Sequence, residues 1–297
     1  MAVILPSGYP LDNRKVALLS EEQAERADIR PLRVGIINVM PQAERYEYHL
    51  LYPLAKTIIQ VEPIWIRLAT HSYKSSDKAH LDRYYQSFDE ANAGQPLDGL
   101  ILTGAPIEQL PYAEVTYWNE LSDILLYARK FIHSTMGICW GGLALAKILG
   151  IEKVTYPMKI FGVYEAKNLD RSHPITGDFD DAFACPQSRH SGIDDAVLER
   201  AMREGTIRLL AHAEGAGYVI FESNDRRYLM HLGHPEYEAE RIATEYWRDQ
   251  KRGRTDVAPP TNYDLQNPLN RWRTNCLDFF TQWLRFLFEA MENNKSR

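Results

Sequence analysis

The feature that most constrains the fold is the alternation of short apolar runs with segments of helical spacing in the first half of the chain. The apolar runs are rich in β-branched residues and predict buried strands. These strands are expected at 33–39, 61–68, 97–104 and 131–139. Helices are expected at 44–59, with a break near Pro53, at 114–130 and at 141–150. Because strands that alternate with helices form parallel βαβ units, this order predicts a doubly wound, mostly parallel α/β sheet flanked by helices.

The second half predicts further strands and two helices. Strands are expected at 207–213, 217–223 and 226–233, the last two as a hairpin, and helices at 235–253, with Pro235 in the first turn, and at 271–291. The aromatic stripe of the last helix indicates core packing. A Pro/Asn-rich loop is expected at 253–270. Residues 1–31 are interpreted as an irregular N-terminal arm, and residues 32–297 as one α/β domain.

Composition excludes several classes of protein. The 297 residues carry a net charge of −6, which argues against a nucleic-acid partner. The three cysteines lie far apart and form no C-x-x-C pair, which argues against a disulfide framework or a metal site and favours a reducing compartment. We find no signal peptide, and no apolar run approaches the roughly 20 residues that span a bilayer. A soluble, cytoplasmic protein without a membrane partner is therefore expected.

One cysteine lies where an apolar strand turns into a helix. The sequence Gly137-Ile138-Cys139-Trp140-Gly141 matches G-x-C-x-G, the spacing of a nucleophile elbow. The N-terminus of the following helix would favour the thiolate form of Cys139. A lone cysteine is more often a buried packing residue. The two glycines and the strand–helix context favour the nucleophile here.

A thiolate nucleophile needs a base, and the stretch HLGHPEYEAE supplies one. His234 follows a predicted strand, and Glu236 lies two residues further on. An acid beside a histidine fixes its tautomer and stabilises its charged form, which is the arrangement of a catalytic triad. Alone, His234 could be a loop histidine and Glu236 an acid near a helix N-terminus. With Cys139, they predict a Cys-His-Glu triad.

The chain resembles a known family. Cys139 followed by His-x-Glu in a doubly wound chain is the arrangement of the class I glutamine amidotransferase-like superfamily. Within it, the sequence is similar to the homoserine O-acyltransferases, also called the homoserine transsuccinylase family. The resemblance extends over most of the chain beyond the arm, and is carried by RPLRVGIINVMP, LDGLILTGAP, VTYWNEL, CWGG, GVYEA, GDFDDAF, SRH, GHPEY, EYWRD and WR.

The resemblance implies roles for the triad and for the oxyanion region. Cys139 resembles the nucleophile that takes the acyl group from coenzyme A. His234 resembles the general base and acid, and Glu236 the residue that orients it. Backbone N–H groups at the elbow, at Trp140, and near Gly104 would stabilise the oxyanion. No permanently bound cofactor or metal is implied.

The resemblance also implies substrate-binding residues. Glu108 resembles the acyl discriminator, at which a glutamate accompanies acetyl donors and a glycine accompanies succinyl donors. Lys159 and Ser188 align with acyl- or substrate-pocket positions. Arg248 looks like the group that pairs with the acceptor's α-carboxylate, and Glu245 could meet its α-amino group.

The implied activity is transfer of an acetyl group from acetyl-CoA to the side-chain hydroxyl of L-homoserine or L-serine, in methionine or cysteine biosynthesis, with a possible homodimer. Gln42 and Ala43 stand where the family usually has two lysines, so both acceptors stay open. Tyr46, Tyr48, His49 and Gln187 also depart from the family pattern. The alternatives are a homoserine O-succinyltransferase, a glutamine amidotransferase-like cysteine hydrolase and a non-catalytic binding protein.

Overall fold

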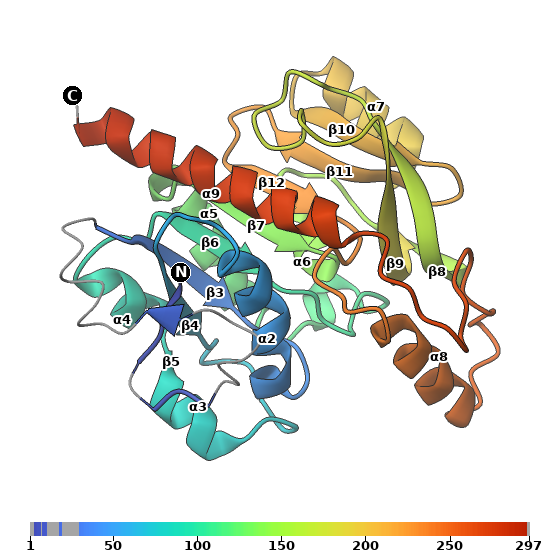
Figure 1. Ribbon diagram of the computed structural model, residues 1–297, viewed down its shortest axis with the longest axis horizontal. Coiled ribbons are helices and arrows are strands. Elements are labelled where there is room, and N and C mark those ends of the chain that lie inside the picture. Colours follow the sequence, from blue (N-terminus) through green and yellow to red (C-terminus); the bar gives the residue numbers. More distant parts are fainter. Residues whose placement is uncertain (1–2, 7, 11–17, 20–29, 296–297) are drawn as a thin grey trace.

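The central feature of the fold is a mixed sheet whose first half is parallel (Figure 1). The computed structural model describes residues 3–6, 8–10, 18–19 and 30–295. The parallel strands lie in the order β4, β3, β6, β7 and β12. Their bounds are Val61–Ile66, Leu32–Ile37, Gly99–Leu102, Ser134–Ile138 and Tyr228–His231. This arrangement confirms the predicted doubly wound, mostly parallel α/β class.

The second half of the sheet is antiparallel and continues from β12 through β11, β10 and β8 to β9. Strands β10 (Ile207–Ala213) and β11 (Gly217–Ser223) have the predicted bounds, and β11 forms the predicted hairpin with β12. At the other edge, β1 (Val3–Ile4) of the N-terminal arm pairs with β2 (Leu18–Leu19) and with β4, while β5 (Tyr85–Gln86) also pairs with β4.

Helices cover both faces of the sheet and bury its two rows of alternating side chains. Helices α2 (Ala43–Leu54) and α9 (Arg273–Lys295) lie on one face, and α5 (Trp118–Phe131) and α6 (Trp140–Ile148) on the other (Figure 1). Ile36 on β3 packs into the first layer and Ile37 into the second, as strand alternation requires. The aromatic stripe of α9 is core, as predicted from its spacing.

Several elements were not predicted from the sequence. The largest are strands β8 (Val154–Asn168) and β9 (Ala182–Gly192), which form an antiparallel pair. The other unpredicted helices have nine residues or fewer, so each offers few turns in which a helical spacing can be recognised. They are helices α3 (Lys78–Tyr84), α4 (Phe88–Ala93) and α7 (Asp195–Arg203) and the 3-10 turn η1 (Tyr112–Glu114).

The predicted start of the helix after His234 is wrong. Helix α8 spans Arg241–Lys251, so Pro235 precedes it by six residues and is not in its first turn. The intervening segment is held by tertiary contacts instead: the Glu236 carboxylate bonds to His234, and the carbonyl of Tyr237 accepts a hydrogen bond of 2.8 Å from the Trp272 indole. These contacts override the local preference for proline at a helix start.

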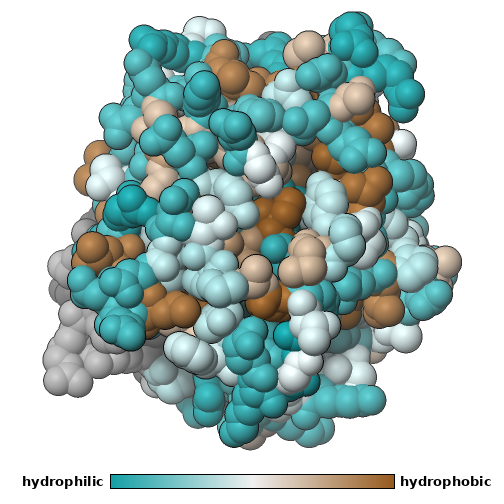
Figure 2. All heavy atoms as spheres, turned by 90° about the vertical axis from the view of Figure 1, so that its right-hand side faces the viewer, coloured by the Kyte–Doolittle hydropathy of each residue, from teal (hydrophilic) through white to brown (hydrophobic). Residues whose placement is uncertain are grey.

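Figure 2 shows one face of the molecule, on which hydrophobic residues form several separate patches between hydrophilic side chains. In the part of the chain that the structure describes, every helix is too short or too polar to cross a membrane.

The packing of α9 gives a testable expectation. Trp283 is fully buried, its ring lies against Gly99 of β6, and its indole N–H donates to Ser134 Oγ at 3.1 Å. Trp283→Ala should lower the free energy of unfolding by about 3–5 kcal/mol. Arg285→Ala on the exposed side of the same helix should change it by less than about 0.5 kcal/mol. Urea unfolding measures both, and equal stability of the two variants would contradict the assigned core.

Candidate active site

Cys139 occupies the strained turn that the sequence predicts. It follows β7 directly, precedes α6, and has φ 52° and ψ −113°. Residues other than glycine rarely adopt a positive φ, because it strains the backbone. This strained conformation persists only where the surrounding structure enforces it. Gly137 and Gly141 allow the backbone of α6 to approach the ends of β6 and β7 closely. A Cβ at Gly141 would lie 2.3 Å from the carbonyl oxygen of Leu102, and one at Gly137 would lie 2.5 Å from the backbone of Gly141.

His234 and Glu236 are next to this cysteine. His234 Nδ1 lies 2.7 Å from Glu236 Oε1, and Cys139 lies close enough to His234 to raise the pKa of its ring. With Nδ1 engaged by the carboxylate, Nε2 is the ring nitrogen left for the sulfur. The His234 ring also stacks on Tyr237, with centroids 4.1 Å apart. The three predicted triad residues therefore meet in a Cys-His-Glu arrangement.

Opposite charges on its two neighbours stabilise the protonated form of His234. Burial alone lowers the pKa of His234, but the charges of Cys139 and Glu236 raise that pKa well above its usual range. For Glu236, burial raises the pKa, but His234 and the hydroxyl of Tyr46 outweigh it and hold that pKa below its usual value. The Tyr46 hydroxyl donates to Glu236 Oε1 at 2.5 Å. The triad can therefore hold an imidazolium between a thiolate and a carboxylate.

The other two cysteines are free and deeply buried. Burial raises the pKa of Cys185 to about 12, and it raises the pKa of Cys276 as well. The negative charge of Glu236 raises both pKa values further. A thiolate nucleophile is therefore expected only at Cys139.

The predicted oxyanion region adjoins the elbow. A Cβ at Gly104 would lie 3.4 Å from Cys139 Cβ and 3.5 Å from His234 Cε1, so the glycine leaves space above both side chains. Trp140 is the first residue of α6, where a backbone N–H has no acceptor within the helix. Its side chain is fully buried and meets Tyr117 edge-on, so any catalytic part of Trp140 comes from its backbone.

A group of buried charges lies beside the triad and is centred on Glu245. The Glu245 carboxylate accepts hydrogen bonds from Ser188 and from the hydroxyl of Tyr237, and it lies 3.7 Å from Lys159 Nζ and 3.2 Å from Arg241 Nε. Burial raises the pKa of Glu245, but the charges of Lys159 and Arg241 outweigh burial and lower that pKa to about 2. Tyr237 joins this group to the triad, because its ring stacks on His234.

Arg248 belongs to the same group and is half-exposed. Its guanidinium lies 2.9 Å from Asp249 Oδ1 and 4.0 Å from Glu245 Oε1, and Lys159 Nζ bonds to Asp249 Oδ2 at 3.0 Å. The structure thus brings together four of the five residues that the resemblance assigned to substrate binding: Lys159, Ser188, Glu245 and Arg248.

Glu108 lies in a separate group, beyond the end of β6. Its carboxylate is 3.5 Å from His190 Nδ1, and its carbonyl oxygen accepts hydrogen bonds from Lys153 and Ser191. Burial raises the pKa of Glu108, but the hydrogen bond with His190 holds it below its usual value. His190 and Ser188 lie two residues apart on β9, and therefore on one face of that strand. Strand β9 thus connects the Glu108 group to the Glu245 group.

Some residues of the site have roles that the sequence did not assign. Tyr46 contacts Glu236, although the sequence marked it only as a departure from the family pattern. Tyr237 is part of the GHPEY motif, and Arg241 lies one helical turn before Glu245, a spacing that places both on one side of α8. Among the residues that the structure describes, no three histidine, cysteine or acidic side chains are grouped as metal ligands.

Comparison with known proteins identifies the family. The sequence pattern of homoserine O-succinyltransferases matches residues 2–293. The chain belongs to this family. It is 38% identical to a homoserine O-acetyltransferase of Geobacillus kaustophilus over 291 residues, which is 95% of this chain and 94% of that relative. It is 35% identical to a homoserine O-acetyltransferase of Lachnoclostridium phytofermentans, over 95% of this chain and 94% of the relative.

Solved structures support the fold. A glutamine amidotransferase from Methylobacillus flagellatus matches 87% of this chain and 96% of its own, with a TM-score of 0.56 and 15% identity. A glutamine amidotransferase from Thermotoga maritima matches 89% of this chain and 99% of its own, with a TM-score of 0.51 and 16% identity. These likenesses confirm the class I glutamine amidotransferase-like fold of this member of the homoserine O-acyltransferases.

The charges around His234 predict how the reactivity of Cys139 toward an alkylating agent depends on pH. Glu236→Gln removes one of the charges that raise the pKa of His234, so the imidazolium beside the sulfur should be lost at a lower pH. Alkylation of Cys139 by iodoacetamide at pH 7, followed by peptide mass, should slow roughly tenfold for each unit by which that pKa falls. Near pH 10, where thiols lose their protons unaided, the difference should shrink.

The matched control is Glu238→Gln, which removes the same charge from an exposed position of the same segment. It should leave the alkylation profile of Cys139 unchanged. A Glu236→Gln profile that overlies the wild-type profile would show that the carboxylate does not support the imidazolium.

Proposed function

We propose that the protein transfers an acetyl group from acetyl-CoA to the side-chain hydroxyl of L-homoserine or L-serine, through an acyl-enzyme on Cys139. The observation that carries the proposal is the buried Cys139–His234–Glu236 arrangement at a nucleophile elbow, in a chain of the homoserine O-acyltransferase family. The product would serve methionine or cysteine biosynthesis. No cofactor is held between turnovers in this scheme.

In the first half-reaction, the thiolate of Cys139 attacks the carbonyl carbon of the acetyl thioester. The oxygen becomes an oxyanion, which the backbone N–H groups at Trp140 and near Gly104 stabilise. The carbon–sulfur bond to coenzyme A then breaks, and His234 gives its proton to the departing sulfur. The acetyl group remains on Cys139 as a new thioester, and coenzyme A leaves as the thiol.

In the second half-reaction, the hydroxyl of the amino acid enters and neutral His234 takes its proton. The oxygen attacks the acetyl carbon, the carbon–sulfur bond to Cys139 breaks, and an ester is released. Glu236 stays ionised throughout, holds the ring of His234 and stabilises its charge. The cysteine leaves as the thiolate beside the imidazolium, which is the state that begins the next cycle.

The charged group beside the triad suits an α-amino acid. Arg248 is half-exposed and has a planar fork that can pair with the α-carboxylate. Glu245 is held ionised and can attract the α-ammonium group, while Lys159 and Ser188 fix its position. Serine and homoserine both satisfy these contacts and differ by one methylene group.

Turnover of the crossed donors and acceptors tests the proposed reaction. With acetyl-CoA and L-homoserine or L-serine, the wild type should form the O-acetyl amino acid, and Cys139→Ser should lower kcat by about 10³-fold or more. Cys185→Ala and Cys276→Ala should stay close to the wild type, because burial keeps both thiols protonated. Normal turnover in Cys139→Ser, or release of free acetate at an equal rate without an acceptor, would refute the transferase.

Glu108 predicts the choice of donor. A partly buried carboxylate at the carboxyl edge of the sheet would crowd and repel the carboxylate of a succinyl group, so we expect acetyl-CoA to be preferred. Glu108→Gly should move the ratio of kcat/KM toward succinyl-CoA. Gln109→Gly, at the exposed neighbouring position, controls for added loop flexibility. If Glu108→Gly leaves the donor ratio of the wild type, Glu108 does not meet the acyl chain.

A further inference from the structure

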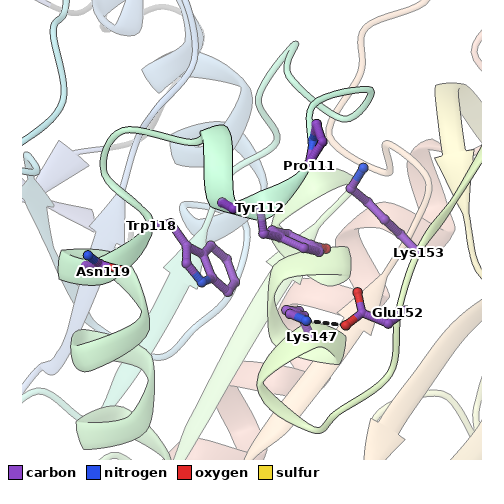
Figure 3. Close-up of a pocket in the computed structure, with 8 residues that line it drawn as sticks. Pro111, Tyr112, Trp118, Asn119, Lys147, Glu152 and Lys153 are labelled. Carbon is purple, nitrogen blue, oxygen red and sulfur yellow. Dashed lines mark hydrogen bonds and ion pairs between the residues drawn. The ribbon is translucent and has the colours of Figure 1, made fainter.

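A cavity beside α6 contains none of the residues assigned above to catalysis. It measures about 610 Å³ and lies between η1, the start of α5, the end of α6 and the segment that leads to β8 (Figure 3). Tyr112 and Trp118 line it, with ring centroids 4.5 Å apart and planes tilted by 40°. Aromatic rings that line a hollow of this size can stack on a planar heterocycle.

Two lysines line the same cavity and lie beside Tyr112. Lys147 Nζ and Lys153 Nζ are 5.8 Å and 5.5 Å from the centroid of the Tyr112 ring. Lys147 also pairs with Glu152, an acid on the cavity wall. Partial burial lowers the pKa of Lys153, so an anion bound beside it would be stabilised by a charge that is poorly solvated. Aromatic faces next to lysines are the surroundings that a nucleotide with phosphate groups requires.

Two hydrogen bonds join residues of the cavity to Glu108 and to helix α6, whose first residue follows Cys139. Lys153 Nζ donates to the carbonyl oxygen of Glu108 at 2.6 Å, and the Tyr112 hydroxyl donates to the carbonyl oxygen of Leu143 at 2.8 Å. Leu143 lies on α6, the helix that begins next to Cys139. Along that helix, Lys147 lies seven residues after Trp140, a rise of about 10 Å. The cavity is therefore separate from the thiolate, but near it and joined to the residue that is proposed to face the acyl group.

We propose that this cavity binds the adenosine 3′-phosphate 5′-diphosphate end of the coenzyme A donor. The adenine stacks on Tyr112 and Trp118, and phosphate groups pair with Lys147 and Lys153. The pantetheine arm then passes Glu108 and carries the thioester to Cys139. This assignment rests on the proposed function, which supplies coenzyme A as the donor.

Direct binding of adenosine 3′,5′-bisphosphate to the full chain tests the site without turnover. Isothermal titration should show binding to the wild type, and Lys153→Met should weaken it by about tenfold, because one charge-assisted contact is lost. Trp118→Ala should weaken it by about tenfold or more through loss of stacking. Glu152→Gln should tighten binding, because it removes a carboxylate from the wall and frees Lys147.

Lys130→Met is the matched control, since Lys130 is a lysine that lies over the ring of Phe131 outside the cavity. It should leave the Kd unchanged. The site would be overturned by absence of binding to the wild type, by equal Kd values in Lys153→Met and Lys130→Met, or by weaker binding in Glu152→Gln.

Turnover with a truncated donor separates this inference from the proposed function. S-acetylpantetheine lacks the nucleotide, so Lys153→Met should raise the KM for acetyl-CoA and leave the KM for S-acetylpantetheine unchanged. An equal rise for both donors would place Lys153 in the positioning of Glu108 and would overturn the nucleotide site. Binding of the bisphosphate with the predicted variant pattern, but no transfer from either donor, would refute the acyltransferase and support a nucleotide site.

Discussion

The site depends on the close approach of the α6 backbone to the ends of β6 and β7. Gly141 lies so near the carbonyl of Leu102 that no side chain fits between them, and Gly137 is equally confined by Gly141. This contact forces Cys139 into positive φ and brings the helix N-terminus to its sulfur. It also leaves Gly104 open above Cys139 and His234, which is the space a reacting carbonyl needs. In the proposed reaction, this one turn therefore positions both the nucleophile and the oxyanion donors.

Around this turn, the protein buries several charges, and each one has a partner. Glu236 is held by His234 and Tyr46, and Glu245 by Lys159, Arg241, Ser188 and Tyr237. Burial of an unpaired charge is costly, so these contacts keep both carboxylates ionised inside the molecule. Tyr237 contacts His234 with its ring and Glu245 with its hydroxyl, which joins the triad to the buried charges around Glu245.

Several strands of the sheet and the turn at Cys139 could be predicted from the sequence, because their signals are local. The apolar runs at 207–213 and 217–223 have the same bounds as strands β10 and β11. Cys139 is flanked by the glycines that its turn requires. Strand β9 could not be predicted, because a buried strand is recognised from apolar residues and this one buries five polar residues. They are Gln187, Ser188, Arg189, His190 and Ser191. The contact of Tyr46 with Glu236 joins positions 190 residues apart, so no local pattern could reveal it.

The central claim is that the thiolate of Cys139 carries the acyl group between donor and acceptor. The most direct test is the intact mass of the full-length protein after mixing with acetyl-CoA in the absence of any amino acid. The account predicts one acetyl group, assigned by peptide mass to Cys139, which disappears when a hydroxy amino acid is added and appears in that amino acid. An unmodified protein that still acetylates the amino acid, or an acetyl group on another residue, would contradict it.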